Sequence, residues 1–157
     1  NCLKWYHNRD ELNVNNEYIL AAASTSGDVK MFRQDMRDPS SFEEILDFHA
    51  HSKSSGPQDP QFGSLNKYSE VWSLVFQDTD DGREGKYFVT CSEDQTCKVW
   101  KLKKRRSRQR KLSTKSYATL KGHTRAITDI AWFKMDPEVL GEENNHLELF
   151  ASCSDDC

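Results

Sequence analysis

The sequence of 157 residues contains no long hydrophobic run, and this absence argues against a membrane-spanning helix within these residues. No segment approaches the roughly 20 consecutive apolar residues that a helix needs to cross a bilayer. The first residues also lack the basic and then apolar pattern of a secretion signal. We therefore expect a protein of the cytosol, with the nucleus as a second location.

The sequence has little net charge and no dense set of cysteines. Its 22 basic and 25 acidic residues give a formal charge of -3, so there is no overall attraction to nucleic acid or to an anionic membrane. Five cysteines are an odd number in a chain without an export signal, which favours reduced thiols. No phosphate-binding glycine loop and no nucleophile paired with a base is visible, so we expect no catalytic residue and no cofactor.

What the sequence does contain is a repeated pattern. Residues 19–33, 88–101 and 150–157 each begin with a short run of apolar and small residues and then enter a serine-rich turn. In the first two copies, alternation resumes after the turn and leads to an aromatic residue. This pattern predicts a β-hairpin, twice complete and once interrupted.

Further strands are predicted before each hairpin. Residues 2–6, 71–76 and 127–133 are short alternating segments rich in aromatic and β-branched residues. Two more segments, 45–51 and 117–123, each end at a histidine. Units of four antiparallel strands that cannot bury both faces alone are typical of the blades of a β-propeller.

The segments LKGH at 120–123 and SEDQTCKVW at 92–100 resemble the Gly-His and Trp-Asp signatures of WD40 repeats. The resemblance implies an all-β partial propeller of about two and a half blades. The blade units are expected at about residues 2–48, 49–120 and 121–157, the last of them incomplete. We expect such a fragment to leave sheet faces and edges uncovered, which favours self-association.

The repeat spacing is longer than WD40 repeats normally show. Ser26 and Asp94 are 68 residues apart and Asp94 and Asp156 are 62 apart, whereas WD40 repeats recur at about 40 to 45 residues. Insertions are therefore expected between strands. The candidate insertions are residues 53–69, 78–86, 103–116 and 134–146.

In WD40 blades, a His, a Ser or Thr, an Asp and a Trp form a hydrogen-bonded chain. These residue types suit the role because imidazole donates and accepts, carboxylate accepts and indole donates. The resemblance assigns His51 (or His49), Ser92 (or Thr90), Asp94 and Trp100 to this chain in the second unit, and His123, Ser154 and Asp156 in the third. The first unit carries Ser26 in place of the Asp and Phe32 in place of the Trp, so we expect it to rely on packing.

Other interpretations of these residues are weaker. A Ser-His-Asp catalytic set is disfavoured because the same residue types recur once per unit, as structural residues do. His49 and His51 lack cysteine or acidic partners at zinc-like spacing, so no metal site is expected. Cys91 and Cys153 occupy equivalent places, TCS and SCS, which favours small strand residues over cluster ligands.

The run KLKKRRSRQRK at 101–111 places eight cations in eleven residues, with no aromatic residue among them for base stacking. A solvated hairpin loop is the simplest interpretation. A nuclear-import signal, or a patch for an acidic protein or RNA, is the alternative. The candidate partner-binding residues are Lys103, Lys104, Arg105, Arg106, Arg108, Arg110 and Lys111.

A narrower resemblance covers several segments in succession. VWSLVF at 71–76, TCSEDQTCKVWK at 90–101, RAITDIAWF at 125–133 and FASCSDD at 150–156 are similar to the WD-repeat subunits of the cytosolic iron-sulfur protein assembly machinery. The resemblance implies a platform that docks assembly factors and apoprotein targets without holding a cluster. The alternative is a nuclear or RNA-associated WD40 scaffold that uses the basic loop at 101–111.

Overall fold

In the computed structural model the described residues are 2–8, 17–52, 69–77, 87–104, 112–134 and 148–156. They form ten strands in three antiparallel sheets, and they include no helix long and apolar enough to cross a membrane. The strands are β1 Cys2–Asn8, β2 Glu17–Ala23, β3 Asp28–Gln34, β4 Phe42–His49, β5 Val71–Phe76, β6 Tyr87–Ser92, β7 Thr96–Lys104, β8 Leu112–Lys121, β9 Ile127–Lys134 and β10 Glu148–Ser154.

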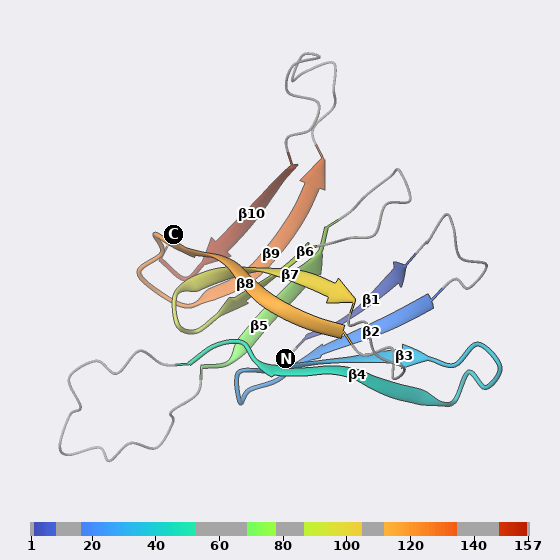
Figure 1. The fold of residues 1–157 in the computed structure, drawn as a ribbon. Coiled ribbons are helices and arrows are strands. Elements are labelled where there is room, and N and C mark those ends of the chain that lie inside the picture. The colour runs from blue at the N-terminus through green and yellow to red at the C-terminus, as the bar shows by residue number, and fades with distance from the viewer. Residues whose placement is uncertain are drawn as a thin grey trace, which may run out of the picture.

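The sheets follow the chain in order. The first sheet is β1-β2-β3-β4, the second is β5-β6-β7-β8, and the third pairs β9 with β10. Figure 1 shows the three sheets succeeding one another, with β5 between β1 and β9. The prediction of an all-β fold of four-stranded antiparallel sheets is therefore confirmed.

Strand alternation decides which side chains pack between the first two sheets. In β3, Val29 and Met31 are completely buried, whereas Lys30 between them points to the opposite face and binds Glu44. Aromatic rings complete the contact: Tyr6 stacks on Phe76 with ring centroids 4.6 Å apart. These residues belong to one hydrophobic core that joins the first and second sheets.

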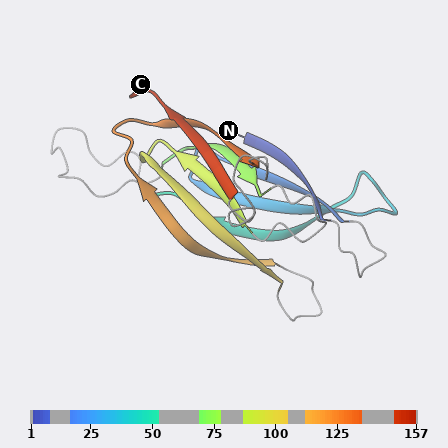
Figure 2. The ribbon, with the colours of Figure 1, turned by 90° about the horizontal axis from the view of Figure 1, so that it is seen from above.

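A second, smaller core lies between the second and third sheets. It contains Val89, Cys91 and Cys97 from β6 and β7 together with Ile127 and Ile130 from β9. The second sheet thus packs one face against the first sheet and the other against the third. Figure 2 shows the same succession from above.

The two complete sheets share their local irregularities. Gly27 has φ 84° in the β2–β3 turn, and Gln95 has φ 66° at the equivalent place in the β6–β7 turn. Their amides donate to the carbonyls of Ser24 and Ser92 across 3.3 and 3.2 Å. A Cβ on Gly27 would lie 2.3 Å from the His51 carbonyl oxygen, so this turn requires glycine.

Parts of two predicted insertions are strand. Strand β7 extends to Lys104 and β8 begins at Leu112, so the insertion expected at 103–116 is confined to 105–111, which lie outside the described residues. Lys134 likewise ends β9. The predicted insertion at 78–86 lies outside the described residues, as do residues 53–68 and 135–146 of two others.

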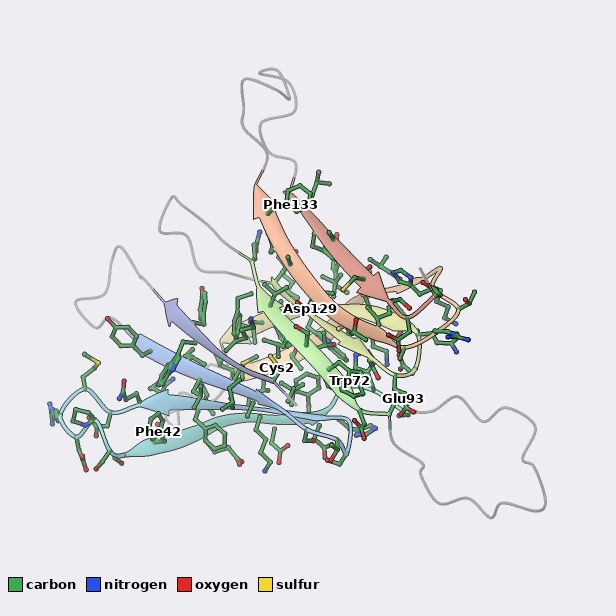
Figure 3. The ribbon with its side chains drawn as sticks, turned by 180° about the vertical axis from the view of Figure 1, so that it is seen from behind. Cys2, Phe42, Trp72, Glu93, Asp129 and Phe133 are labelled. Carbon is green, nitrogen blue, oxygen red and sulfur yellow. The ribbon has the colours of Figure 1, made fainter. Side chains whose placement is uncertain are left out.

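Large apolar side chains are exposed on the outer sheets. Leu3, Trp5 and Phe42 are exposed on the first sheet, and Phe133 and Leu149 are exposed on the third. Figure 3 shows Phe42 and Phe133 far apart on opposite parts of the structure. Self-association through these surfaces stays a prediction.

Candidate functional site

Four polar side chains form a hydrogen-bonded chain between the first and second sheets. His51 follows β4 and is completely buried. Its Nδ1 lies 2.9 Å from Asp94 Oδ2, and its Nε2 lies 2.7 Å from Thr90 Oγ1. The indole N–H of Trp100 donates to the same Thr90 oxygen across 2.9 Å. Because His51 follows the first sheet and the other three belong to the second, the chain ties one sheet to the next.

The chemistry of the groups assigns the direction of these hydrogen bonds. An indole only donates and a carboxylate only accepts, so Trp100 donates to Thr90 and His51 Nδ1–H donates to Asp94; with a neutral ring Nε2 is then an acceptor, and the Thr90 hydroxyl donates to it. This arrangement needs a neutral imidazole. Burial lowers the pKa of His51 below its usual value and therefore favours that neutral form.

Asp94 is held as a carboxylate by its hydrogen bonds. Burial by itself raises the pKa of Asp94, but hydrogen bonds from His51 and Thr96 more than offset this effect and leave the pKa below its usual value. Thr96 donates both its hydroxyl, at 2.6 Å, and its amide, at 3.0 Å, to Asp94 Oδ1. The Asp94 carboxylate therefore stabilises the β6–β7 turn and also orients the His51 imidazole.

Ser92, predicted as the hydroxyl of this chain, is not the residue that bonds to His51. The Ser92 hydroxyl instead accepts the amide N–H of Asp94 at 3.2 Å. Two residues along a strand correspond to about 7 Å, which separates Ser92 from the position that Trp100 can reach. Thr90, the alternative in the sequence, occupies that position.

A similar arrangement joins the second sheet to the third. His123 follows β8, and its Nδ1 lies 3.0 Å from Asp156 Oδ1. Its Nε2 lies 3.0 Å from the hydroxyl of Ser152 in β10. The amide of Thr124 also donates to Asp156, and together with the His123 hydrogen bond it lowers the pKa of Asp156 to about 2.

Ser154 is also displaced from its predicted role. Its hydroxyl donates to the carbonyl of Arg125 across 3.2 Å and accepts the amide of Asp156 across 3.3 Å. Ser152, two residues earlier, makes the bond to His123. The correction is the same as in the second sheet, because Thr90 and Ser152 both precede their aspartate by four residues.

A cavity of about 530 Å³ lies beside this second junction. It is lined by Leu120, Lys121, Gly122, His123, Thr124, Ser152 and Asp156. Three of these residues, His123, Ser152 and Asp156, are already bonded to one another in the sheet junction. The cavity therefore belongs to the structural arrangement.

The first sheet has a different polar chain from the one described above. His49 Nδ1 lies 2.8 Å from Asp28 Oδ1, and Asp28 Oδ2 accepts the Ser26 hydroxyl. Ala22 stands where the second sheet has Thr90, and Phe32 stands where it has Trp100. The expectation that this sheet relies on packing is therefore incomplete. The carboxylate of Asp28 also stabilises the β2–β3 turn through its hydrogen bonds to Ser26 and His49.

The geometry does not favour acid-base or nucleophilic catalysis at these junctions. His51 contacts the Thr90 hydroxyl and the Asp94 carboxylate of the second sheet. His51 and Thr90 have no exposed surface, so a substrate cannot reach this imidazole. A corresponding His–Asp–hydroxyl set recurs at the next junction around His123. Recurrence at successive sheets is what a structural role requires.

Cys91 and Cys97 are small buried residues of strands in this fold. Cys91 and Cys97 face each other on β6 and β7 and are buried. Burial raises the pKa of Cys91 to about 12 and that of Cys97 to about 11, so both thiols are protonated at neutral pH. In the part of the chain that the structure describes, no three His, Cys, Asp or Glu side chains are arranged to hold a metal ion.

The structure describes only the beginning of the predicted basic loop. Lys103 is an exposed residue of β7, and the backbone of Lys104 continues that strand. The other predicted partner-binding residues, Arg105, Arg106, Arg108, Arg110 and Lys111, lie outside the described residues.

Comparison with known proteins agrees with the repeated geometry. Residues 62–101 and 114–157, more than half of the chain, match the family model described as "WD domain, G-beta repeat". No curated protein matches the chain.

Proposed function

Because the chain belongs to the WD40-repeat family, we propose that it is a protein-interaction scaffold that docks assembly factors and apoprotein targets of cytosolic iron-sulfur protein assembly. WD40 repeats support a scaffold role in general, and proteins built from them are typically not enzymes. The step to iron-sulfur assembly rests on the successive segments 71–76, 90–101, 125–133 and 150–156 that resemble its WD-repeat subunits. We place the protein in the cytosol, and secondly in the nucleus.

One observation carries the scaffold proposal. The residues with the greatest catalytic potential, His51, Thr90 and Asp94, are bonded to one another inside the sheets. Their hydrogen bonds fix the first sheet against the second, and exposed side chains remain available for contacts with other proteins. A rigid sheet framework with an accessible surface fits docking better than chemistry.

The proposal is tested by affinity purification of the tagged full chain from cell extract under reducing conditions. The expected result is specific recovery of iron-sulfur assembly factors, identified by immunoblot, relative to an unrelated WD40 protein as bait. Recovery of none of these factors by a folded chain would contradict the proposal. Circular dichroism of the bait checks that its sheets are intact.

A second candidate function is a nuclear or RNA-associated scaffold. It is favoured by the density of cations at 101–111. The matched variant replaces Lys103, Lys104, Arg105, Arg106, Arg108, Arg110 and Lys111 with Gln. If this function holds, the variant loses RNA binding and the salt dependence of the remaining binding flattens. RNA binding unchanged by the substitutions would remove this candidate.

A further inference from the structure

The second sheet exposes a group of basic and aromatic side chains, which we call the cationic-aromatic cluster. Its members are Tyr87 of β6, Lys101 and Lys103 of β7, and Lys115 and Tyr117 of β8. Strand pairing brings them together, because Tyr87 is opposite Lys101 and Lys101 is opposite Lys115. The cluster lies toward the ends of these strands that are remote from the β6–β7 turn.

The aromatic rings of the cluster are in contact with each other and with a cation. Lys101 Nζ lies 5.3 Å from the centre of the Tyr87 ring, within the range of a cation–π interaction. Tyr87 and Tyr117 form an edge-to-face pair with ring centroids 5.2 Å apart. Tyr117 is nevertheless 68% exposed, the largest exposure among the large apolar side chains described.

The first sheet has an ion pair at the positions equivalent to the two lysines. In both sheets a β-bulge interrupts the pairing of the third and fourth strands, between Met31 and Phe32 and between Val99 and Trp100. One pair beyond the first bulge, Arg33 faces Glu43 and binds it at 3.2 Å. One pair beyond the second, two lysines face each other.

Two like charges directly opposite each other destabilise a sheet unless a countercharge is near. Lys101 and Lys115 form such a pair. Among the described residues, no carboxylate forms an ion pair with Lys101, Lys103 or Lys115. In the part of the chain that the structure describes, the positive charge of the cluster therefore has no counter-ion and is available to a partner.

The bulges also place their extra residues differently. In the first sheet the residue without a register partner is Ile45, which is 1% exposed and packs in the core. In the second sheet the equivalent residue is Tyr117, which faces solvent beside Tyr87. A bulge commonly redirects a side chain toward a functional surface.

From this pairing of exposed tyrosines with uncompensated lysines, we propose that the cationic-aromatic cluster docks an extended acidic peptide segment of a partner protein. This inference rests on the proposed scaffold function. Carboxylates of the segment accept hydrogen bonds from the lysine ammonium groups, while its apolar side chains cover the ring of Tyr117. Strand β8 is the outer strand of its sheet, and among the described strands it pairs only with β7, so an extended segment can pair along its other edge.

A peptide fits these observations better than a nucleic acid. The whole chain carries a formal charge of -3, so the positive charge of the cluster is local and suits a short acidic segment better than a long polyanion. Tyrosine is enriched at the centres of protein interfaces.

The test measures fluorescence anisotropy of a labelled dodecapeptide of alternating Glu and Val with the full chain. The matched probes are the same peptide with Gln in place of Glu, and an oligouridylate of equal length. We expect only the Glu peptide to bind, with affinity that falls as salt is added. Equal binding of the Gln peptide, tighter binding of the oligouridylate, or no binding of the Glu peptide would overturn the inference.

Substitutions locate the site. Tyr117→Ala is expected to weaken peptide binding at least about fivefold and Lys115→Gln about threefold. Lys121→Gln, at the other end of the same strand, serves as the control and leaves binding unchanged. Unchanged binding of Tyr117→Ala and Lys115→Gln would contradict the assigned site.

Lys115→Glu separates docking from folding. It recreates the type of pair that Arg33 and Glu43 form in the first sheet, so it is expected to abolish peptide binding without lowering the unfolding midpoint in urea. Binding retained by this variant would contradict the inference. Because the peptide assay is independent of the affinity purification, recovery of assembly factors with no peptide binding would reject the inference and leave the proposed function standing.

Discussion

The imidazole of His51 and the carboxylate of Asp94 lie 2.9 Å apart although 43 residues separate them in the sequence. His51 follows the last strand of the first sheet, and Asp94 lies in the β6–β7 turn of the second. His123 and Asp156 repeat the relationship between the second sheet and the third, at 3.0 Å. Each imidazole therefore lies in the segment that connects one sheet to the next. We expect its loss to weaken both the packing between the two sheets and the turn that contains the aspartate.

Replacing Thr90 by Val tests the centre of the first junction. The substitution keeps the shape of the side chain but leaves the Trp100 indole and His51 Nε2 without their buried partner. We expect the free energy of unfolding to fall by about 2 to 3 kcal/mol in urea titrations. Thr119→Val, on an exposed position of β8, is the control and changes stability little. A loss for Thr90→Val no larger than that of the control would contradict the assignment.

Replacing Gly27 by Ala tests the turn beneath His51. The new Cβ would collide with the His51 carbonyl oxygen, and φ of 84° is unfavourable for alanine. We expect a loss of about 2 kcal/mol or more in the free energy of unfolding. Gly122→Ala is the matched control, because a Cβ there meets nothing within 4 Å. Equal thermal midpoints for the two variants would show that the turn has another conformation.

In the equivalent turn of the second sheet, a substitution is expected to raise the free energy of unfolding instead of lowering it. Gln95 adopts φ of 66°, which glycine adopts without strain. Gln95→Gly is therefore expected to raise the free energy of unfolding by about 0.5 kcal/mol, because relief of the left-handed backbone exceeds the entropy cost of glycine. The measurement is the urea midpoint, and a lowered midpoint would argue against a left-handed residue at this position.

The burial of His51 predicts a dependence of stability on pH. The pKa of His51 is lower in the folded chain than its usual value of 6.5. As pH falls through 6.5, the unfolded chain binds a proton that the folded chain does not, so the free energy of unfolding decreases. Asp94, whose folded pKa is also lowered, adds a further loss only as pH falls through and below 3.8.

His51→Gln provides the comparison for this pH effect. Glutamine can donate to Asp94 and accept from Thr90 but does not titrate. We expect the variant to be less stable than the wild type at pH 7.5 and to show a shallower decline between pH 7 and pH 5. If the wild type gained stability over this interval, or if both chains had the same slope, His51 would not be a buried neutral imidazole.

Much of the fold could be predicted because strand alternation and the repeated turns are local properties. The β6–β7 hairpin around Asp94 and the turn at Asp156 after β10 follow from short runs of alternating residues that end in serine and acid. Such runs do not show where a strand ends. The sequence therefore did not predict that β7 and β8 extend into the insertion expected at 103–116. Residues 101–111 form one continuous basic run, KLKKRRSRQRK, with no glycine or proline to mark where a strand ends.

The sequence alone could not identify which hydroxyl bonds to each of the two histidines, His51 and His123. Hydroxyl residues stand both two and four positions before each aspartate: Ser92 and Thr90 in one unit, Ser154 and Ser152 in the other. Composition cannot separate them, because the decision depends on the register that places Trp100 beside Thr90. The polar chain of the first sheet was missed for a similar reason, since Asp28 reaches His49 only through the pairing of β3 with β4.

The tautomer of His51 tests the central structural claim most directly, and a long-range ¹H–¹⁵N correlation spectrum at neutral pH measures it. The hydrogen-bonded chain from Trp100 through Thr90 to Asp94 predicts a neutral ring with its proton on Nδ1 and none on Nε2. A ring protonated on Nε2, a charged ring, or a rapidly exchanging mixture of tautomers would contradict it.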